Sequence, residues 1–222
     1  MTDSTQTYPL LIFDWDGTLM DSQARIVNCL RQAALEHGHA DRSDAEFKNV
    51  IGLGLREALQ HLFPDQDETQ IESLAGCYRD HYLYKNETPS PLFAGVAELL
   101  EDLEQAGYLL AIATGKGRQG LDQALAHSGL EKRFHITRCA SETRSKPHPQ
   151  MLEEILDFTG MRAGQALMIG DTEYDLQMAS NAGMASLAVS YGVHEADRLL
   201  KHKPVGCLHH IDELADYLRN LA

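Results

Sequence analysis

A short apolar run that ends in two acids is the feature that most constrains this chain. Residues Leu10 to Phe13 are all apolar, which is typical of a buried strand, and the run stops at Asp14. A second carboxylate, Asp16, follows one residue later, and alternate residues of an extended chain point to the same side. Two like charges so close repel each other unless a cation or a proton lies between them. The segment therefore predicts a metal site at the end of the strand, unless the two acids only begin a solvated turn.

Two turns that contain glycine are candidates for holding an anion. Gly17 follows the paired acids and lets the backbone turn tightly with its amide exposed. Thr114 and Gly115 follow a second apolar run, where a hydroxyl and backbone amides together can hold phosphate oxygens. An ordinary turn can contain the same residues. We nevertheless expect Gly17, Thr114 and Gly115 to bind phosphate.

The composition limits the possible partners. The chain has 222 residues, of which 43% are hydrophobic, so it can bury a full core as one domain or as one domain with an insert. Its formal net charge of −14 disfavours nucleic acid, because affinity for that polymer relies on clustered Lys and Arg. A small anionic substrate remains compatible if a metal and a few basic residues reverse the potential locally.

Neither the cysteines nor the N-terminus indicates export. The four cysteines are far apart and lack C-x-x-C spacing, so we expect reduced thiols rather than a disulfide scaffold or a zinc site. The first eight residues are polar and do not resemble a signal peptide, and no apolar run approaches the roughly 20 residues of a membrane span. We expect a cytoplasmic monomer or homodimer with no membrane partner.

The kind of secondary structure that the sequence predicts changes twice along the chain. After the first strand we expect only helices, with Ser22 and Asp44 capping the first two, over residues 22–37, 44–51, 56–63 and 68–84. A polar, proline-containing connection at 86–91 ends this block. Helices then alternate with short apolar runs, the expected helices being 96–105, 121–127, 150–158, 174–181 and 211–221 and the expected strands 109–113, 134–139, 166–169 and 185–189.

This alternation predicts an α/β fold with a doubly wound parallel sheet, which is a Rossmann-like core. The helical block is then an all-helical cap inserted after the first strand. We expect the core to comprise residues 1–20 and 92–222 and the cap residues 21–91. Such an insert would lie above the carboxyl ends of the strands, where ligands bind in sheets of this kind.

Two further segments carry candidate chemistry. Lys146 precedes a predicted helix, and a fixed ammonium there would stabilise charge that develops on transferring oxygens, although a lone Lys is normally solvated. Asp171 ends a predicted strand, and Asp175 lies one helical turn further on the same side. Carboxylate oxygens are the ligands that Mg²⁺ prefers, although acids at a helix start also complement the helix dipole.

The segments together resemble the four signatures of the haloacid dehalogenase superfamily, in the family's order. They are Asp14-Trp15-Asp16-Gly17-Thr18, Thr114 at a strand end, Lys146 before Pro147, and Gly170-Asp171 with Asp175. The helical insert is similar to the cap of the phosphoglycolate phosphatase and beta-phosphoglucomutase branch. In that branch an Asn commonly follows the motif Thr, whereas this chain has Gly115, so any contact of that Asn with substrate is absent.

The resemblance implies a role for each motif residue. Asp14 would be the nucleophile that forms an aspartyl phosphate, and Asp16 the general acid and base. Lys146 would bridge the nucleophile and the phosphoryl group. Asp14, the Asp16 carbonyl and Asp171 would hold Mg²⁺, with Asp175 bound directly or supporting it from the outer shell.

The resemblance leaves the substrate open. Residues 51–57 resemble the specificity loop of the branch, so we expect Arg56 and also Lys116 to select the substrate. The expected function is Mg²⁺-dependent hydrolysis of a small anionic phosphomonoester. Phosphoglycolate is the substrate that the branch suggests, while sugar phosphates, nucleotides and pyrophosphate stay open. The alternatives are a beta-phosphoglucomutase-like phosphotransferase and a catalytically idle binding protein.

Overall fold

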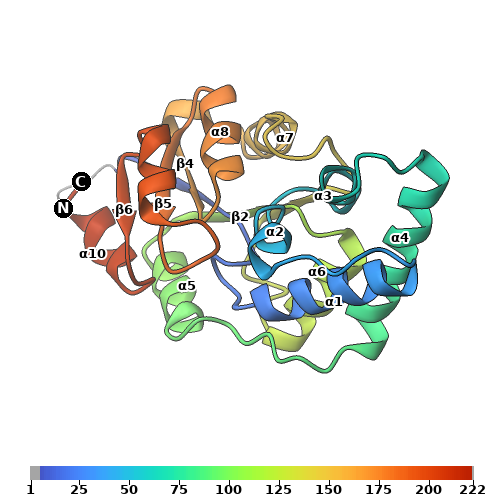
Figure 1. Ribbon diagram of the computed structural model, residues 1–222. Helices are drawn as coiled ribbons and strands as arrows, with labels where there is room; N and C mark the ends of the chain where they lie inside the picture. Colours follow the sequence, from blue (N-terminus) through green and yellow to red (C-terminus); the bar gives the residue numbers. More distant parts are fainter. Residues whose placement is uncertain (1–5, 222) are drawn as a thin grey trace, which may run out of the picture.

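The structure, a computed structural model, describes residues 6–221 and is built around one parallel sheet (Figure 1). The strands lie in the order β3-β2-β1-β4-β5-β6, so the chain starts in the middle of the sheet and winds outward in both directions. The predicted doubly wound α/β fold is thus confirmed. The strands are β1 (Leu10–Phe13), β2 (Leu109–Thr114), β3 (Ile136–Cys139), β4 (Ala166–Gly170), β5 (Ala185–Val189) and β6 (Gly206–Leu208).

Helices cover both faces of the sheet, which explains why β1 is apolar at every position. Leu11 and Phe13 pack on one helical layer, whereas Leu10 and Ile12 pack on the other, and all four side chains are fully buried. The first layer contains α5 (Val96–Gln105), α6 (Arg118–Ser128) and α10 (Glu213–Arg219). The second contains α7 (Gln150–Thr159) and α8 (Glu173–Asn181), and Figure 1 shows it on the opposite side of the sheet from α5.

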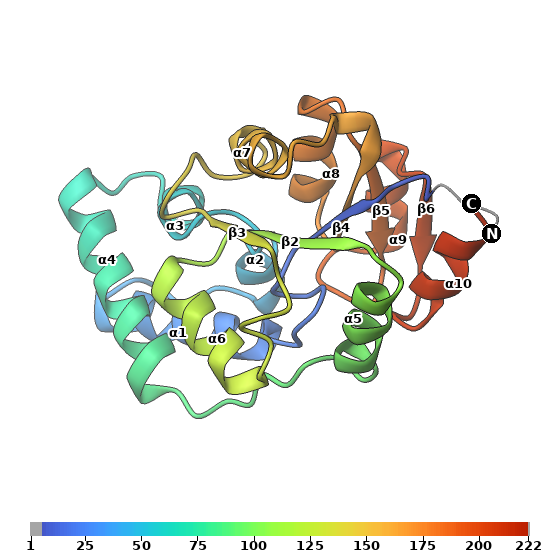
Figure 2. The same cartoon turned by 180° about the vertical axis from the view of Figure 1, so that it is seen from behind.

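The block between β1 and β2 is helical, as the sequence predicts. It has a hydrophobic cluster of its own, centred on buried residues such as Leu30, Phe47 and Leu59. Figure 2 shows these helices gathered at the end of the molecule opposite β6 and α10. They are α1 (Gln23–Glu36), α2 (Asp44–Lys48), α3 (Leu55–Leu62), α4 (Glu68–Asp80) and the π-helix η1 (His81–Lys85).

Several details differ from the sequence-based expectation. Ser43, not Asp44, caps α2, because its hydroxyl accepts the Glu46 amide while the Glu46 carboxylate accepts the Ser43 amide. The short elements β6, α9 (Ala196–Leu199), η2 (Ala163–Gln165) and η3 (Leu200–His202) were not predicted, since three or four residues show no periodicity. Residues 1–5 and 222, which belong to the expected core, lie outside the described residues. Among residues 6–221 no helix has the length and apolar character that a bilayer crossing requires.

The topology brings the candidate residues to one edge of the sheet. The central strands β1, β2 and β4 run parallel, so their carboxyl ends lie together, and these ends carry Asp14, Thr114 and Asp171. The loop before α3 packs on the same edge, because a Cβ placed on Gly115 would lie only 2.5 Å from the carbonyl oxygen of Leu53. The helical block therefore covers the strand ends, as expected for such an insert.

Candidate active site

Three buried carboxylates meet at the ends of β1 and β4. Asp14, Asp171 and Asp175 each offer an oxygen within 4.8 Å of the other two. Sheet pairing continues one residue beyond β1, since the Asp14 amide donates to the Ile169 carbonyl at 2.9 Å, and this fixes Asp14 beside β4. Gly17 makes the following turn with φ of 88°, and a Cβ there would overlap the Asp171 carboxylate. The turn after β1 and the end of β4 can come together only with glycine at this position.

Local hydrogen bonds fix the two acids at the start of α8. Thr18 Oγ1 donates to Asp171 Oδ1, and the Val193 amide donates to Asp171 Oδ2, each at 2.8 Å. Thr172 donates to Asp175 Oδ2 through its amide at 3.1 Å and through its hydroxyl at 2.7 Å, which makes a capping arrangement at the helix start. The protein's own donors therefore hold both carboxylates in place.

Lys146 is buried among the acids. Its Nζ lies 2.8 Å from Asp14 Oδ1 and 2.6 Å from Asp175 Oδ1. Burial alone would lower the pKa of Lys146, but Asp14 and Asp175 outweigh that effect and hold the pKa above its ordinary value. The ammonium therefore stays charged beside Asp14.

The acid cluster fits a divalent cation. Asp14 Oδ2 is buried and has no hydrogen-bond or ion-pair partner within residues 6–221, while Asp14 Oδ1 has only its ion pair with Lys146. Burial raises the pKa of Asp14 well above its ordinary range, and burial followed by repulsion from Asp175 raises the pKa of Asp171 to about 7. Unsatisfied oxygens and crowded negative charge are what a hard cation with oxygen ligands would relieve.

Asp16 lies beside this cluster and has different partners. Ser22 Oγ donates to Asp16 Oδ1 at 2.6 Å, and Lys116 Nζ lies 2.9 Å from the same oxygen. Ser22 does occupy the position before α1, as predicted, but its hydroxyl makes no cap hydrogen bond and is directed to Asp16 instead. Lys116 also donates to the Tyr82 hydroxyl at 2.8 Å. The contacts of Lys116 could not be predicted from the sequence, because Asp16 and Tyr82 are both far from Lys116 in the chain.

The turn after β2 lies under the loop of the helical block. Thr114 is fully buried, and its Oγ1 accepts the Lys116 amide at 3.1 Å. Gly115 faces the carbonyls of Gly52 and Leu53, and the Gly54 amide donates to Ser145 Oγ at 2.7 Å. The loop and the sheet edge therefore touch directly on two sides of the site.

A cavity of about 470 Å³ lies between the helical block and the sheet edge. Its lining includes Asp14, Asp16, Thr114 and Gly115, so the structure brings these predicted residues to one space. Arg56 also lines the cavity, but it is about half exposed and forms an ion pair with Glu68. The structure thus gives Arg56 a protein partner, which the sequence did not indicate.

Other contacts join the helical block to the core. Arg198 donates to Asn49 Oδ1 at 2.7 Å and pairs with Glu173 at 2.5 Å, and the Tyr174 hydroxyl donates to the Asn49 carbonyl. The Arg198 hydrogen bond lowers the pKa of Glu173 to about 2. The Glu173 carboxylate is therefore directed to Arg198.

Comparison with known proteins agrees with the motifs. The family model described as haloacid dehalogenase-like hydrolase matches residues 11–189. The chain is 33% identical over 202 residues to the probable phosphatase IndB of Dickeya dadantii, which covers 88% of this chain and 87% of that protein. It is 30% identical over 212 residues to a phosphoglycolate phosphatase of Mesorhizobium japonicum, which covers 93% of this chain and 92% of that protein.

Solved structures show the same architecture. A haloacid dehalogenase-like family hydrolase from Streptococcus pneumoniae superposes with a TM-score of 0.83 at 25% identity, and the match covers 95% of this chain and 98% of the other. The chain therefore belongs to the haloacid dehalogenase-like hydrolases, and the predicted family is confirmed.

Proposed function

We propose that this hydrolase is a Mg²⁺-dependent phosphatase that cleaves a small phosphate monoester through an aspartyl phosphate on Asp14. One observation carries the proposal. Asp14 is buried, its Oδ1 pairs with the charged Lys146 at 2.8 Å, and its Oδ2 has no hydrogen-bond partner within the described residues. A nucleophile needs an unengaged oxygen, and an adjacent cation favours its ionised form.

The reaction would proceed in two displacements. In the first, a carboxylate oxygen of Asp14 attacks phosphorus, the ester P–O bond breaks, and Asp16 gives its proton to the leaving alcohol oxygen. In the second, Asp16 takes a proton from water, which attacks phosphorus and releases inorganic phosphate and the Asp14 carboxylate. Ser22 and Lys116 both contact Oδ1 of Asp16, which leaves Oδ2 to carry the proton.

The surrounding residues would hold the phosphoryl group. Lys146, the Thr114 hydroxyl and the Gly115 amide are the donors proposed for its oxygens, whereas the Gly17 amide, predicted to bind phosphate, already donates to the Met20 carbonyl at 2.8 Å. Lys116 is proposed to position Asp16 rather than to select the substrate, because its ammonium already pairs with the Asp16 carboxylate.

Mg²⁺ is the proposed cofactor. Asp14, Asp171 and the backbone carbonyl of Asp16 would hold it, and it would neutralise charge on the transferring phosphoryl group. Asp175 would support the site from the outer shell, because Lys146 and Thr172 already engage both of its oxygens.

The domain boundaries and the location also remain proposals. Residues 21–91 are proposed as the cap because they contain a hydrophobic cluster separate from those of the sheet, leaving 1–20 and 92–222 as the core. A cytoplasmic location is proposed because the four cysteines, which all lie within the described residues, are free.

The test measures release of inorganic phosphate from a panel of phosphate monoesters with Mg²⁺ and with EDTA. We expect release only with the metal, and its loss in Asp14→Asn but not in the exposed control Asp102→Asn. With nitrophenyl phosphate, whose leaving group departs without a proton, Asp16→Asn should accumulate a phosphorylated peptide that contains Asp14. Transfer of the phosphoryl group to a sugar without phosphate release would instead identify a phosphotransferase. No turnover of any ester would favour the alternative of a catalytically idle binding protein.

A further inference from the structure

The cavity above the catalytic acids is larger than a very small ester requires. Its volume of about 470 Å³ is within the range of about 300–1,000 Å³ that holds drug-sized ligands. The phosphoryl group itself would occupy only the end at Asp14 and Thr114. Much of the remaining wall comes from apolar and aromatic residues of the helical block, namely Ile26, Leu30, Val50, Tyr78, Tyr82 and Leu83.

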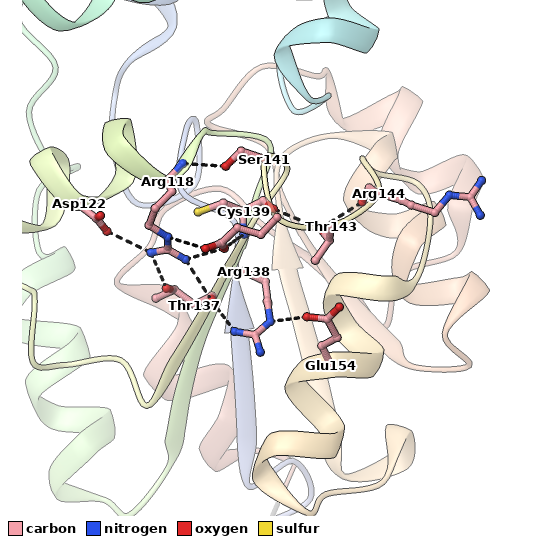
Figure 3. Close-up of polar contacts among 10 residues, drawn as sticks. Arg118, Asp122, Thr137, Arg138, Cys139, Ser141, Thr143, Arg144 and Glu154 are labelled. Atoms are coloured by element: carbon pink, nitrogen blue, oxygen red, sulfur yellow. Dashed lines mark hydrogen bonds and ion pairs between the residues drawn. The ribbon is translucent and has the colours of Figure 1, made fainter.

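The cations that line this cavity are already engaged by acids. Lys116 pairs with Asp16 at 2.9 Å, and the other pairs are Arg56 with Glu68, Arg79 with Glu72 at 3.0 Å, and Arg118 with Glu142 at 2.8 Å. Figure 3 shows the Arg118 guanidinium turned toward Asp122 and Thr137, which bind it in addition. No lining cation is left unpaired among the described residues.

The lining also holds an acid that no cation balances. Glu57 lines the cavity and has no ion-pair partner within the described part of the chain, while Glu72 adds a second carboxylate. A carboxylate or a second phosphate on the substrate would lie near these acids. It could bind a lining arginine only by displacing the acid that already pairs with that arginine. The charge pattern beyond the phosphoryl end therefore favours a leaving group without negative charge.

A pair of stacked aromatic rings lies close to Asp16, the proposed general acid. The rings of Tyr78 on α4 and Tyr82 on η1 are stacked, with centroids 5.7 Å apart and planes inclined by 25°. The Tyr82 hydroxyl accepts the Lys116 ammonium that holds Asp16, so the pair is adjacent to the oxygen that would leave. The Tyr78 hydroxyl makes no hydrogen bond within residues 6–221, and its ring is only partly buried.

We infer that the substrate is a phosphate monoester whose leaving alcohol carries an uncharged, flat unsaturated ring, and that Tyr78 and Tyr82 contact this ring. The inference rests on the proposed phosphatase function. Flat rings pack favourably on tyrosine, and an apolar wall would bury the ring's remaining surface. The ring could belong to a nucleoside base or to a simple aryl group, which share this chemistry. A short ester with a carboxylate has no flat surface to offer these two rings.

Two pairs of esters test the inference. The first pair differs in the ring, the second differs in the ring and in a carboxylate, and every ester has a primary alcohol as leaving group. One arm compares uridine 5′-monophosphate with ribose 5-phosphate, and the other compares benzyl phosphate with 2-phosphoglycolate. We expect kcat/KM to be at least about tenfold higher for the ring-bearing ester in one arm, which is the scale of an aromatic contact. The arm that shows the preference identifies the source of the ring.

Variants of Tyr78 then assign the contact. Tyr78→Leu should reduce the preference by about tenfold, Tyr78→Phe should retain it, and Tyr84→Leu, which removes an exposed ring outside the lining, should match the wild type. Equal kcat/KM within both arms, a preference for 2-phosphoglycolate, or an unchanged preference in Tyr78→Leu would overturn the inference while leaving the phosphatase function intact. Absence of phosphate release from every ester would instead refute the proposed function.

Discussion

Replacing Asp171 by Asn should stabilise the metal-free protein at alkaline pH. Burial and the charge of Asp175 raise the pKa of Asp171 to about 7 from an ordinary value of 3.8. Between these values the folded chain retains a proton that the unfolded chain has released. The free energy of unfolding therefore falls as the pH rises through this window, and above pH 7 the whole penalty is present.

The size of the effect follows from the two pKa values. Their difference corresponds to at most about 4 kcal/mol at pH 8. An Asn side chain avoids this penalty and keeps its partners, because its amide oxygen can accept the Val193 amide while its NH₂ group donates to the Thr18 hydroxyl. The variant should therefore be more stable than the wild type by a few kcal/mol at pH 8 and by much less at pH 5.

Urea denaturation in EDTA, followed by Trp15 fluorescence, measures this difference. Trp15 is the only tryptophan and is fully buried, so its emission should report unfolding. Saturating Mg²⁺ should then stabilise the wild type, by about 2.7 kcal/mol at 100 times its dissociation constant, and should stabilise Asp171→Asn far less. Parallel pH profiles for the two proteins in EDTA, or equal stabilisation of both by Mg²⁺, would refute the reasoning.

Three further substitutions probe the site and its cover. Lys146→Met should destabilise the metal-free protein by about 3–5 kcal/mol in urea denaturation, because it leaves buried acids unpaired; no loss would contradict the buried ion pair. Gly115→Ala should raise KM about tenfold, since its Cβ would press on the Leu53 carbonyl and overpacking costs about 1–3 kcal/mol; an unchanged KM would count against that contact. Arg198→Met should lower the free energy of unfolding by about 1.5–3 kcal/mol and speed limited proteolysis at residues 86–91, because the hydrogen bond from Arg198 to Asn49 is lost. Unchanged proteolysis would show that this hydrogen bond does not hold the helical block on the core.

The core of the fold could be predicted because its local patterns agree with its long-range packing. β1 is apolar at every position since helices cover both faces, and the run ends where the polar site begins. The regular spacing of α5 and β5 gave their bounds correctly, at Val96–Gln105 and Ala185–Val189. The three-residue strand β6 escaped prediction, because its position at the sheet edge depends on pairing with β5 rather than on a pattern of its own.

The partners of the site residues could not be predicted in the same way. Ser22 is a good helix cap by composition, yet its hydroxyl accepts no helix amide and instead donates a charge-assisted hydrogen bond to the Asp16 carboxylate. Lys116 follows a phosphate-type turn, but folding brings it within 2.9 Å of Asp16 and beside Tyr82. A sequence motif specifies which residue types reach a site, whereas the pairing of neighbouring charges depends on distances that only the folded chain sets.

These pairings also reconcile an acidic chain with an anionic substrate. The net charge of −14 would repel a phosphate ester, and four of the carboxylates that contribute to it lie in the site, at Asp14, Asp16, Asp171 and Asp175. Two buried ammonium groups, from Lys116 and Lys146, compensate half of that charge. One divalent cation would bring the formal charge to zero, and without it a proton on Asp171 would compensate part of the remainder. The cation would therefore be needed before the ester can bind, because a dianionic phosphoryl group would otherwise enter a pocket of its own sign.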